Sequence, residues 1–435
     1  MAAPEPGFTP LLLALPSLTP SLALEVLPHG VTLHRLIAQA DGMTHDLLIG
    51  PEIPNDHLTQ KYTNTLVGRY ANRLPVHDEP HILQRNSFTS TFTPLNNESP
   101  KVSLHGGRVG FDAVDWTPLL DNSESQLFTP KELSHVLPGA GVVFSRISED
   151  GEEGYPGKLL VEALVTLVDP SGPQTQNAAN GGEVNLGSLV IVYRAKLLDE
   201  GKVTPINLTQ HWGFNLGASL KDGPEPSLSV KDHTLAIKAD HTIELDSTGL
   251  STGSLLAVAG THHAHAEKET KTIGERWPTN GYGGYNEFYV FSPREKASLP
   301  TRIPIDKFTP DVDLVNDIIT SEASATSPLV ELASAKSGLR ISFDSNQSGV
   351  QFYSNNFASE SKGARKKIHG GSGISGAGDG YGVGSAAFLE FHEPLAAWLH
   401  PATKPHSDDD TLLASGEVYN NFVKLDVWFK APATA

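Results

Sequence analysis

The chain has 435 residues, of which 38% are hydrophobic. That content supplies a sizeable core and argues against a disordered protein. The formal net charge of −18 repels phosphate backbones and anionic membrane surfaces, so we expect no nucleic-acid or membrane partner. The sequence contains no cysteine, which excludes disulfides, thiolate metal sites and cysteine nucleophiles.

The N-terminal stretch "MAAPEPGFTPLLLALPSLTP" carries no basic residue before its short apolar run, and prolines interrupt that run. It therefore fits neither a signal peptide nor a membrane-spanning helix. We expect a soluble, cytoplasmic protein, although the sequence leaves secretion open.

Alternating hydrophobic residues dominate the rest of the chain and predict β-strands. Residues 158–169 and 187–198 read as two long strands, and shorter strands are predicted within 228–245, 287–293, 329–345, 349–357 and 386–394. The clearest alternation is "NNFVKLDVWFK" (420–430). There Val423, Leu425, Val427 and Phe429 should face one way, and Lys424, Asp426 and Trp428 the other.

Glycine (40 residues) and proline (31 residues) punctuate these segments, and sustained helical periodicity is scarce. This pattern predicts an all-β fold, a large antiparallel β-sandwich with few short helices. No shift in composition marks a boundary, so we expect one continuous domain over residues 1–435. Surface insertions are expected near 120–140, 170–186, 293–328 and 358–385. The last of these is rich in glycine and serine and is expected to be a mobile loop.

Four segments concentrate polar and ionisable residues. They are "NTLVGRYANRLP" with Asn72 and Arg73, "SLHGGRVGFDAVDW" with His105, "INLTQHWGFNLG" with His211, and "AAFLEFHEPLAAWLHP" with Glu390. Each residue alone has an ordinary explanation, such as a solvated arginine, a histidine in a turn or a glutamate at a strand edge. Two histidines, an arginine and a carboxylate beside aromatic residues together favour a functional cleft.

An imidazole and a carboxylate in one cleft suit general acid–base chemistry, because an unperturbed histidine has a pKa of ~6.5. Such a pair moves one proton onto a substrate and another off it, so we expect no metal and no cofactor. Sugars fit such a site, since their hydroxyls need fixed donors and acceptors and their C–H faces pack on aromatic rings. Trp116, Trp212 and Tyr353 are candidates for that aromatic surface.

Four motifs, in this order, resemble the aldose 1-epimerase (galactose mutarotase) family. They are "GRYANRL", "LHGGRVGFDAVDW", "NLTQHWGFNL" and "SGVQFYSNNF". The resemblance covers most of the chain, from the Asn–Arg strand to the final strand. It implies the family's galactose mutarotase-like supersandwich fold and a monosaccharide substrate.

The resemblance also implies a role for each matching residue. Asn72 and Arg73 would contact the sugar, and His105 and Gln351 would bind it. His211 would be the general acid and Glu390 the general base. The implied reaction interconverts the α and β anomers of free hexoses through ring opening. It should show a bell-shaped pH profile, limited at low pH by protonation of Glu390 and at high pH by deprotonation of His211.

The chain departs from the family pattern at one sugar-contacting position. The family has an aspartate in a Tyr-Asp-His-Asn-Phe segment, whereas the best match here, "GYNEFYVF", carries Asn286. We assign Asn286 to substrate binding, but asparagine lacks the charge-assisted hydrogen bond of a carboxylate. Glu287 is adjacent but should face the opposite side of a strand. Trp212, Gly213 and His392 also differ from the family's usual residues.

Two other functions are compatible with the sequence. The first is an epimerase of a modified sugar such as a hexose 6-phosphate, which would need additional cations in the pocket. The second is a non-catalytic carbohydrate-binding or regulatory module, for which Asn286 would be the motive. Retention of both His211 and Glu390 argues against it, because binding alone needs no acid–base pair.

A histidine-rich segment, "THHAHAEKE" (261–269), could bind a metal. On a strand, His263, His265 and Glu267 would share one face. Short histidine runs are common on surface loops and the implied reaction needs no metal, so we expect none here.

Overall fold

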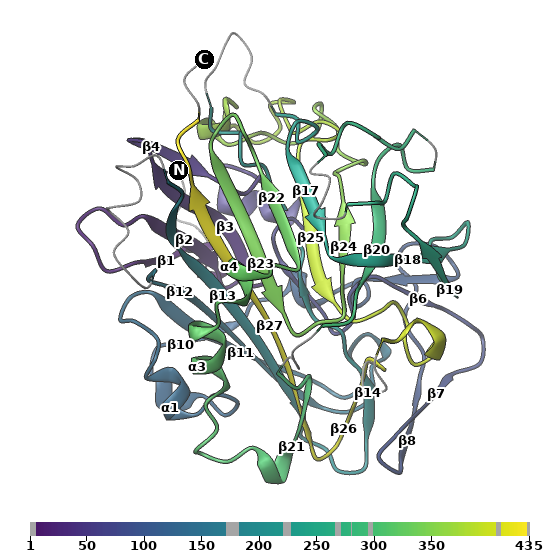
Figure 1. Cartoon of the computed structure of the whole chain (residues 1–435). Helices are drawn as coiled ribbons and strands as arrows, with labels where there is room; N and C mark the ends of the chain where they lie inside the picture. The colour runs from purple at the N-terminus through teal and green to yellow at the C-terminus, as the bar shows by residue number, and fades with distance from the viewer. Residues whose placement is uncertain are drawn as a thin grey trace.

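The structure is a computed structural model that describes residues 6–170, 182–220, 228–265, 271–279, 281–294, 299–405 and 410–432. As predicted, the described chain is built mainly of antiparallel β-strands (Figure 1). Its α-helices are short: α1 (Pro130–Leu133), α3 (Leu314–Thr320) and α4 (Ala323–Thr326). The 3₁₀ turns are η1 (Pro6–Phe8), η2 (Pro54–Leu58), η3 (Phe111–Ala113), η4 (Asn122–Glu124), η5 (Glu152–Gly154), η6 (Ile305–Lys307), η7 (Lys367–His369) and η8 (Pro401–Thr403).

The largest sheet contains the long strands that the sequence predicts. Its order is β10 (Thr117–Leu119), β11 (Gly141–Ser148), β12 (Leu159–Val168), β13 (Val184–Leu197), β27 (Glu417–Phe429), β23 (Leu339–Ser345), β22 (Val330–Ala333) and β17 (Thr234–Ile237), with β21 (Arg302–Pro304) also paired to β27. Figure 1 shows β13, β27 and β23 side by side, although β27 is the last strand in the chain.

Strand β27 shows the predicted alternation. Val423, Leu425 and Val427 lie in the main core. On the other face, the Lys424 ammonium donates to the backbone oxygens of Ile319 and Ser321 at 2.8 and 2.6 Å. This polar face is covered by the segment that carries α3 and α4, so its charged side chains are buried rather than solvated.

The second large sheet positions the functional residues. Its order is β16 (Gly213–Phe214), β25 (Ala387–His392), β24 (Gly349–Tyr353), β20 (Asn286–Phe291), β18 (Ala239–Leu245) and β19 (Ser251–Ala257). Because side chains alternate along a strand, Val350, Phe352, Leu389 and Phe391 join the main core. The residues between them point to the opposite face.

The N-terminal region forms a four-stranded sheet of β1 (Leu11–Ala14), β2 (Leu22–Leu27), β3 (Thr32–Ala40) and β4 (Met43–Asp46). Four two-stranded ladders complete the described strands. They pair β5 (Leu66–Val67) with β15 (Thr209–Gln210), β6 (Arg73–Pro75) with β9 (Val102–Leu104), β7 (His81–Arg85) with β8 (Phe88–Phe92), and β14 (Val203–Pro205) with β26 (Leu412–Ala414).

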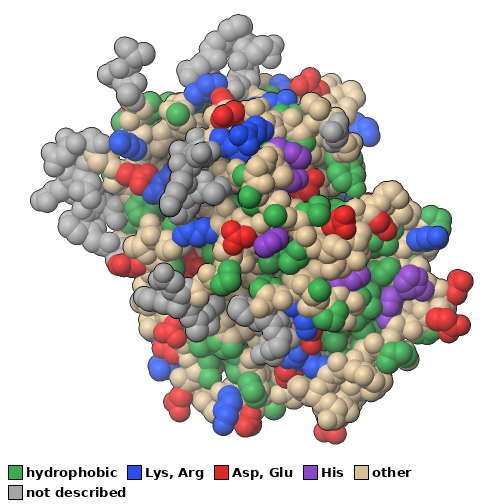
Figure 2. Space-filling model, turned by 45° about the vertical axis from the view of Figure 1, so that its right-hand side comes forward, with side chains coloured by type: hydrophobic (Ala, Val, Ile, Leu, Met, Phe, Trp, Pro, Cys, Tyr) green, Lys and Arg blue, Asp and Glu red, His purple; other side chains and the backbone are tan. Residues whose placement is uncertain are grey.

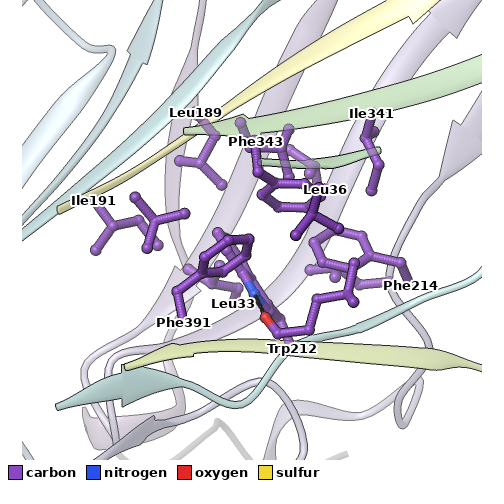
Figure 3. Close-up of a cluster of buried hydrophobic side chains, with 14 of the residues drawn as sticks. Leu33, Leu36, Leu189, Ile191, Trp212, Phe214, Ile341, Phe343 and Phe391 are labelled. Carbon is purple, nitrogen blue, oxygen red and sulfur yellow. Dashed lines mark hydrogen bonds between the residues drawn. The ribbon is translucent and has the colours of Figure 1, made fainter. Parts of the chain in front are cut away.

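The main core lies where these sheets meet. Figure 3 shows its centre, where Leu33, Leu36, Leu189, Ile191, Trp212, Phe214, Ile341, Phe343 and Phe391 converge. Trp212 is 0% exposed and Trp116 is 2% exposed, and each indole N–H donates to a backbone oxygen. The expectation that these two tryptophans bind sugar is therefore wrong, because both are core residues.

On the face shown in Figure 2, lysine and arginine side chains are interspersed with acidic ones and form no continuous basic area. Among the described residues, no helix is both long enough and apolar enough to cross a bilayer.

Three of the four expected insertions fall wholly or largely on described residues. The segment near 120–140 carries η4 and α1, and the segment near 293–328 carries β21, η6, α3 and α4. Residues 171–181, most of the segment near 170–186, lie outside the described residues. The single domain with surface insertions stays a prediction.

The segment 358–385 is anchored rather than loose. Lys366 lies in its basic stretch "KGARKKIHGG" (362–371) and is fully buried. Its ammonium donates to the backbone oxygens of His34 (2.6 Å) and Leu48 (2.9 Å) and to the Asp46 carboxylate (2.8 Å). The anchor ties this segment to β3 and β4.

Replacing Lys366 with methionine should destabilise the protein by about 3–5 kcal/mol, because it leaves the buried Asp46 carboxylate without its main partner. The free energy of unfolding from denaturant titration checks this. The neighbouring Lys367→Met, at an exposed position, is the control and should change stability by under ~0.5 kcal/mol. Equal effects of the two substitutions would contradict the anchor.

Candidate active site

All seven predicted site residues line one pocket of about 660 Å³. They are Asn72, Arg73, His105, His211, Asn286, Gln351 and Glu390. Tyr353, predicted as an aromatic contact, lines the same pocket. Residues from six separate stretches of the chain therefore meet at one place.

The floor of the pocket is the face of the second sheet that points away from the core. Gln351 on β24 lies directly opposite Glu390 on β25 in the strand register, and Tyr353 lies opposite both Phe388 on β25 and Asn286 on β20. Asn286 faces the pocket while Glu287 does not line it, as the alternation of a strand requires. The placement of Asn286 beside Gln351 supports the alignment from which its role was predicted.

The wall that carries His105 is held against Asn72 by reciprocal hydrogen bonds. The backbone N–H of His105 donates to the backbone oxygen of Asn72 at 3.0 Å. The backbone N–H of Asn72 donates to Nδ1 of His105 at 3.2 Å. Gly106 follows at φ 87°, and a Cβ there would meet the Gly68 oxygen at 2.0 Å. The glycine after the histidine is thus required for the chain to pass this close.

His211 lies between β15 and β16, with its backbone paired to residues 64 and 65. Asn64 N–H donates to the His211 oxygen, and His211 N–H donates to the Thr65 oxygen. In this extended segment neighbouring side chains point to opposite sides. His211 therefore enters the pocket while Trp212 enters the core.

The imidazole of His211 and the carboxyl group of Glu390 are in contact. Nε2 of His211 is 3.3 Å from Oε1 of Glu390, and the two side chains are 12% and 3% exposed. The His211 ring also packs against Phe388 at 4.9 Å and against His105 at 5.3 Å between ring centroids. The two groups are thus enclosed by rings and by the sheet.

Burial reverses the usual order of the two pKa values. Burial raises the pKa of Glu390 to about 8, although the positive charge of Arg73 opposes the rise. Burial lowers the pKa of His211 to about 4. Between these values the pair holds one proton, and burial favours the form in which both groups are neutral, with that proton on Glu390. Burial thus disfavours the imidazolium that the predicted role of His211 as general acid requires, and that role stays a prediction.

Hydrogen bonds link three amide side chains across the pocket, and each bond has a defined donor and acceptor. Nδ2 of Asn72 donates to Oε1 of Gln351 at 3.1 Å, and Nε2 of Gln351 donates to Oδ1 of Asn286 at 3.0 Å. The side-chain oxygen Oδ1 of Asn72 accepts a hydrogen bond from the backbone N–H of Arg73 at 3.0 Å. Each amide oxygen is therefore already engaged by the protein.

His105, His211 and Glu390 place possible metal-ligand atoms within 4.8 Å of one another. The hydrogen bonding of His105 opposes a metal there. Its Nδ1 accepts the Asn72 N–H, and burial holds its pKa well below the usual value, so the ring is neutral with its proton on Nε2. That nitrogen is a donor and has no lone pair for a metal.

The histidine-rich segment does not form the strand that the metal hypothesis required. Residues 261–263 form a bend and turn, and Glu267 lies outside the described residues. Among the described residues, this segment contributes to no cluster with metal-ligand spacing.

Glu98 and Tyr62 are among the pocket residues that were not identified from the sequence. Glu98 binds Arg73 through two hydrogen bonds of 2.6 Å, and the ring of Tyr62 packs against His105 at 4.7 Å. Both line the pocket. Glu98 lies on a polar loop and Tyr62 in a turn-rich stretch, where no periodic pattern distinguishes them.

A family model described as aldose 1-epimerase matches residues 18–425. The chain belongs to the aldose 1-epimerase family. A galactose mutarotase of Bos taurus is 28% identical over 414 residues, covering 94% of this chain and 91% of that protein. An aldose 1-epimerase of Escherichia coli is 27% identical over 226 residues, covering 52% and 51%.

The fold of this aldose 1-epimerase family member is also found in solved structures. A GalM/aldose epimerase homologue from C. elegans superposes with a TM-score of 0.66 at 20% identity, covering 97% of this chain and 99% of that one. A galactose 1-epimerase from Lactobacillus acidophilus gives a TM-score of 0.58 at 18% identity, covering 94% and 91%. The predicted galactose mutarotase-like fold is confirmed.

Replacing Glu390 with glutamine should stabilise this family member at alkaline pH. A carboxyl whose pKa is raised from 4.5 to about 8 lowers folding stability as pH rises through that window, because the unfolded chain loses its proton first. The substitution removes this effect and should gain about 2–4 kcal/mol at pH 8 and little at pH 5.

Chemical denaturation at pH 5, 6, 7 and 8 measures the difference. The exposed Glu79→Gln serves as the control and should show no pH-dependent gain. A difference between Glu390→Gln and the unchanged protein that does not vary with pH would show that Glu390 is ionised in the folded state.

Proposed function

We propose that the protein is an aldose 1-epimerase that interconverts the α and β anomers of free hexoses without a metal or cofactor. The observation that carries the proposal is the contact between His211 and Glu390, 3.3 Å apart in a pocket lined by hydrogen-bonding side chains. A sugar-binding module needs donors and acceptors, but it does not need a buried acid–base pair that shares one proton.

The reaction needs one proton removed and one added. One member of the pair takes the proton of the C1 hydroxyl while the other donates a proton to the ring oxygen, and the C1–O5 bond breaks to give the aldehyde. Rotation about C1–C2 presents the other face of the carbonyl. Closure runs the two transfers in reverse and restores the pair to its starting state.

The family resemblance makes Glu390 the base and His211 the acid. Those roles need a carboxylate and an imidazolium, which hold the same single proton as the neutral pair favoured by burial. The two forms differ by one transfer over 3.3 Å. The positive charge of Arg73 favours the carboxylate by lowering the Glu390 pKa, so it assists the form that those roles require.

The other pocket residues hold the sugar. Arg73 and the Nε2–H of His105 supply donors for oxygens on which negative charge develops. The amide of Asn286 has its oxygen bound by Gln351, so its amino group is offered to the ligand. Tyr353 supplies an aromatic face for sugar C–H groups.

The alternative of a phosphorylated sugar gains one observation. Lys61 and Lys362 line the pocket together with Arg73, and a phosphorylated sugar would need such additional cations. A mutarotation assay with glucose 6-phosphate decides between the two substrates: a kcat/KM more than tenfold above that for glucose would favour the phosphorylated sugar.

The cytoplasmic location and the lack of nucleic-acid and membrane partners stay predictions.

Polarimetry of freshly dissolved α-glucose and α-galactose tests the activity. The protein should accelerate the approach to anomeric equilibrium, and His211→Ala and Glu390→Gln should each lower kcat by about 10²–10⁴-fold. Lys367→Met, which is remote from the pair, should retain activity. Folded protein without acceleration would favour the binding module, and full activity in both active-site variants would refute the assigned roles.

The pH profile of kcat/KM should be a bell whose limbs follow the shifted pKa values. Below about 4 both groups are protonated and no base remains, and above about 8 both are deprotonated and no acid remains. The acid limb thus belongs chiefly to His211 and the alkaline limb to Glu390, the reverse of the expectation from unperturbed values. Limbs near 4.5 and 6.5 would show that the pocket does not shift the pair.

A further inference from the structure

The pocket offers a sugar many donors and few strong acceptors. Arg73, His105, Lys61 and Lys362 all donate. Among the described side chains that line the pocket, the carboxyl groups are those of Glu98 and Glu390. Glu390 belongs to the acid–base pair, and the amide oxygens of Asn72, Gln351 and Asn286 already accept hydrogen bonds from the protein. Glu98 is therefore the strongest acceptor left for a sugar hydroxyl, because its oxygens carry a negative charge and the neutral amide oxygens do not.

The loop that carries Glu98 is fixed by its own hydrogen bonds. The side chain of Asn97 donates to the Leu104 oxygen at 2.9 Å and accepts the Leu104 N–H at 2.6 Å. The Glu98 N–H donates to the Val102 oxygen at 3.3 Å. The position of Glu98 is thus set by strand β9, whose next residue along the chain is His105.

The carboxylate of Glu98 is oriented by Arg73. Its two oxygens accept from Nε and Nη2 of the guanidinium at 2.6 Å each, and each oxygen keeps a second lone pair. The side chains are 31% and 13% exposed, so the carboxylate is accessible at the pocket wall. The pair presents a charged acceptor beside a charged donor.

We propose that Glu98 is a specificity-determining residue whose carboxylate accepts a hydrogen bond from one hydroxyl of the sugar, while Arg73 donates to the hydroxyl on the neighbouring carbon. The Arg73–Glu98 pair thus recognises a vicinal diol. This inference rests on the proposed function for the identity of the ligand as a sugar, and it concerns recognition rather than the proton-transfer step.

The test compares Glu98→Gln with the unchanged protein on glucose and on its 2-, 3-, 4- and 6-deoxy derivatives. With glucose, KM should rise about 10–100-fold, as expected for a lost hydrogen bond to a charged group, while kcat changes by less than about threefold. With the one deoxy sugar that lacks the bound hydroxyl, the substitution should have almost no effect. Glu98→Asp should recover part of the affinity for glucose.

The matched control is Glu183→Gln, because Glu183 is 33% exposed and forms a similar two-bond pair with Arg340 away from the pocket. It should leave KM unchanged for every sugar. If Glu98→Gln reduced kcat/KM by the same factor for glucose and for all four deoxy sugars, Glu98 would only hold Arg73 and the proposal would be overturned.

Calorimetric titration with the same sugars separates this inference from the proposed function. A protein that binds glucose without turnover would refute the epimerase, yet weaker binding by Glu98→Gln alone, with one insensitive deoxy sugar, would still support the diol site. Unchanged glucose binding by Glu98→Gln would overturn the diol site even if turnover were observed. Failure of the unchanged protein to bind any of the sugars would overturn both.

Discussion

The contact between His211 and Glu390 is the constraint on which the site depends. Two charged groups at this depth would be costly, because each would lose most of its hydration. Holding a single proton, the pair can exist as two neutral groups 3.3 Å apart and still present one acid and one base to a substrate. The neutral form thus lowers the cost of burying the pair, and burial moves the two pKa values past each other.

The sheet that places this pair has two functions at once. Strands β24 and β25 send Phe352 and Phe391 into the core, and they send Gln351 and Glu390 into the pocket. A slip of one residue in register would exchange the two faces. The packing that stabilises the sheet therefore also fixes the floor of the pocket.

The opposite wall is built by shorter elements. The β6–β9 ladder pairs Arg73 with Leu104, the residue before His105. Reciprocal hydrogen bonds with Asn72 set the tautomer of that histidine. The anchored segment around Lys366 continues from residues such as Ser359 and Lys362 that close part of the rim. Catalytic floor and binding wall thus come from different sheets that meet at the pocket.

Much of this arrangement could be predicted from the sequence. Strand alternation identifies the long strands, and the four motifs contain five of the seven predicted site residues. The other two, Asn286 and Glu390, come from the segments "GYNEFYVF" and "AAFLEFHEP". What escaped prediction depends on burial and on long-range pairing. Trp212 follows His211 and so points into the core. Lys366 lies in a segment that was expected to be a mobile loop. The role of Glu98 becomes apparent only when its loop lies beside Arg73. The pKa order likewise follows from depth, which a motif does not report.

The protonation state of His211 in the folded, sugar-free protein tests the account most directly. Nitrogen-15 NMR of histidine-labelled protein, with the His211 signal assigned by its loss in His211→Ala, reports that state between pH 5 and 9. The account predicts a neutral imidazole at pH 6, with no titration up to the pH at which Glu390 ionises. A His211 imidazolium at pH 6 that loses its proton near 7 would contradict it.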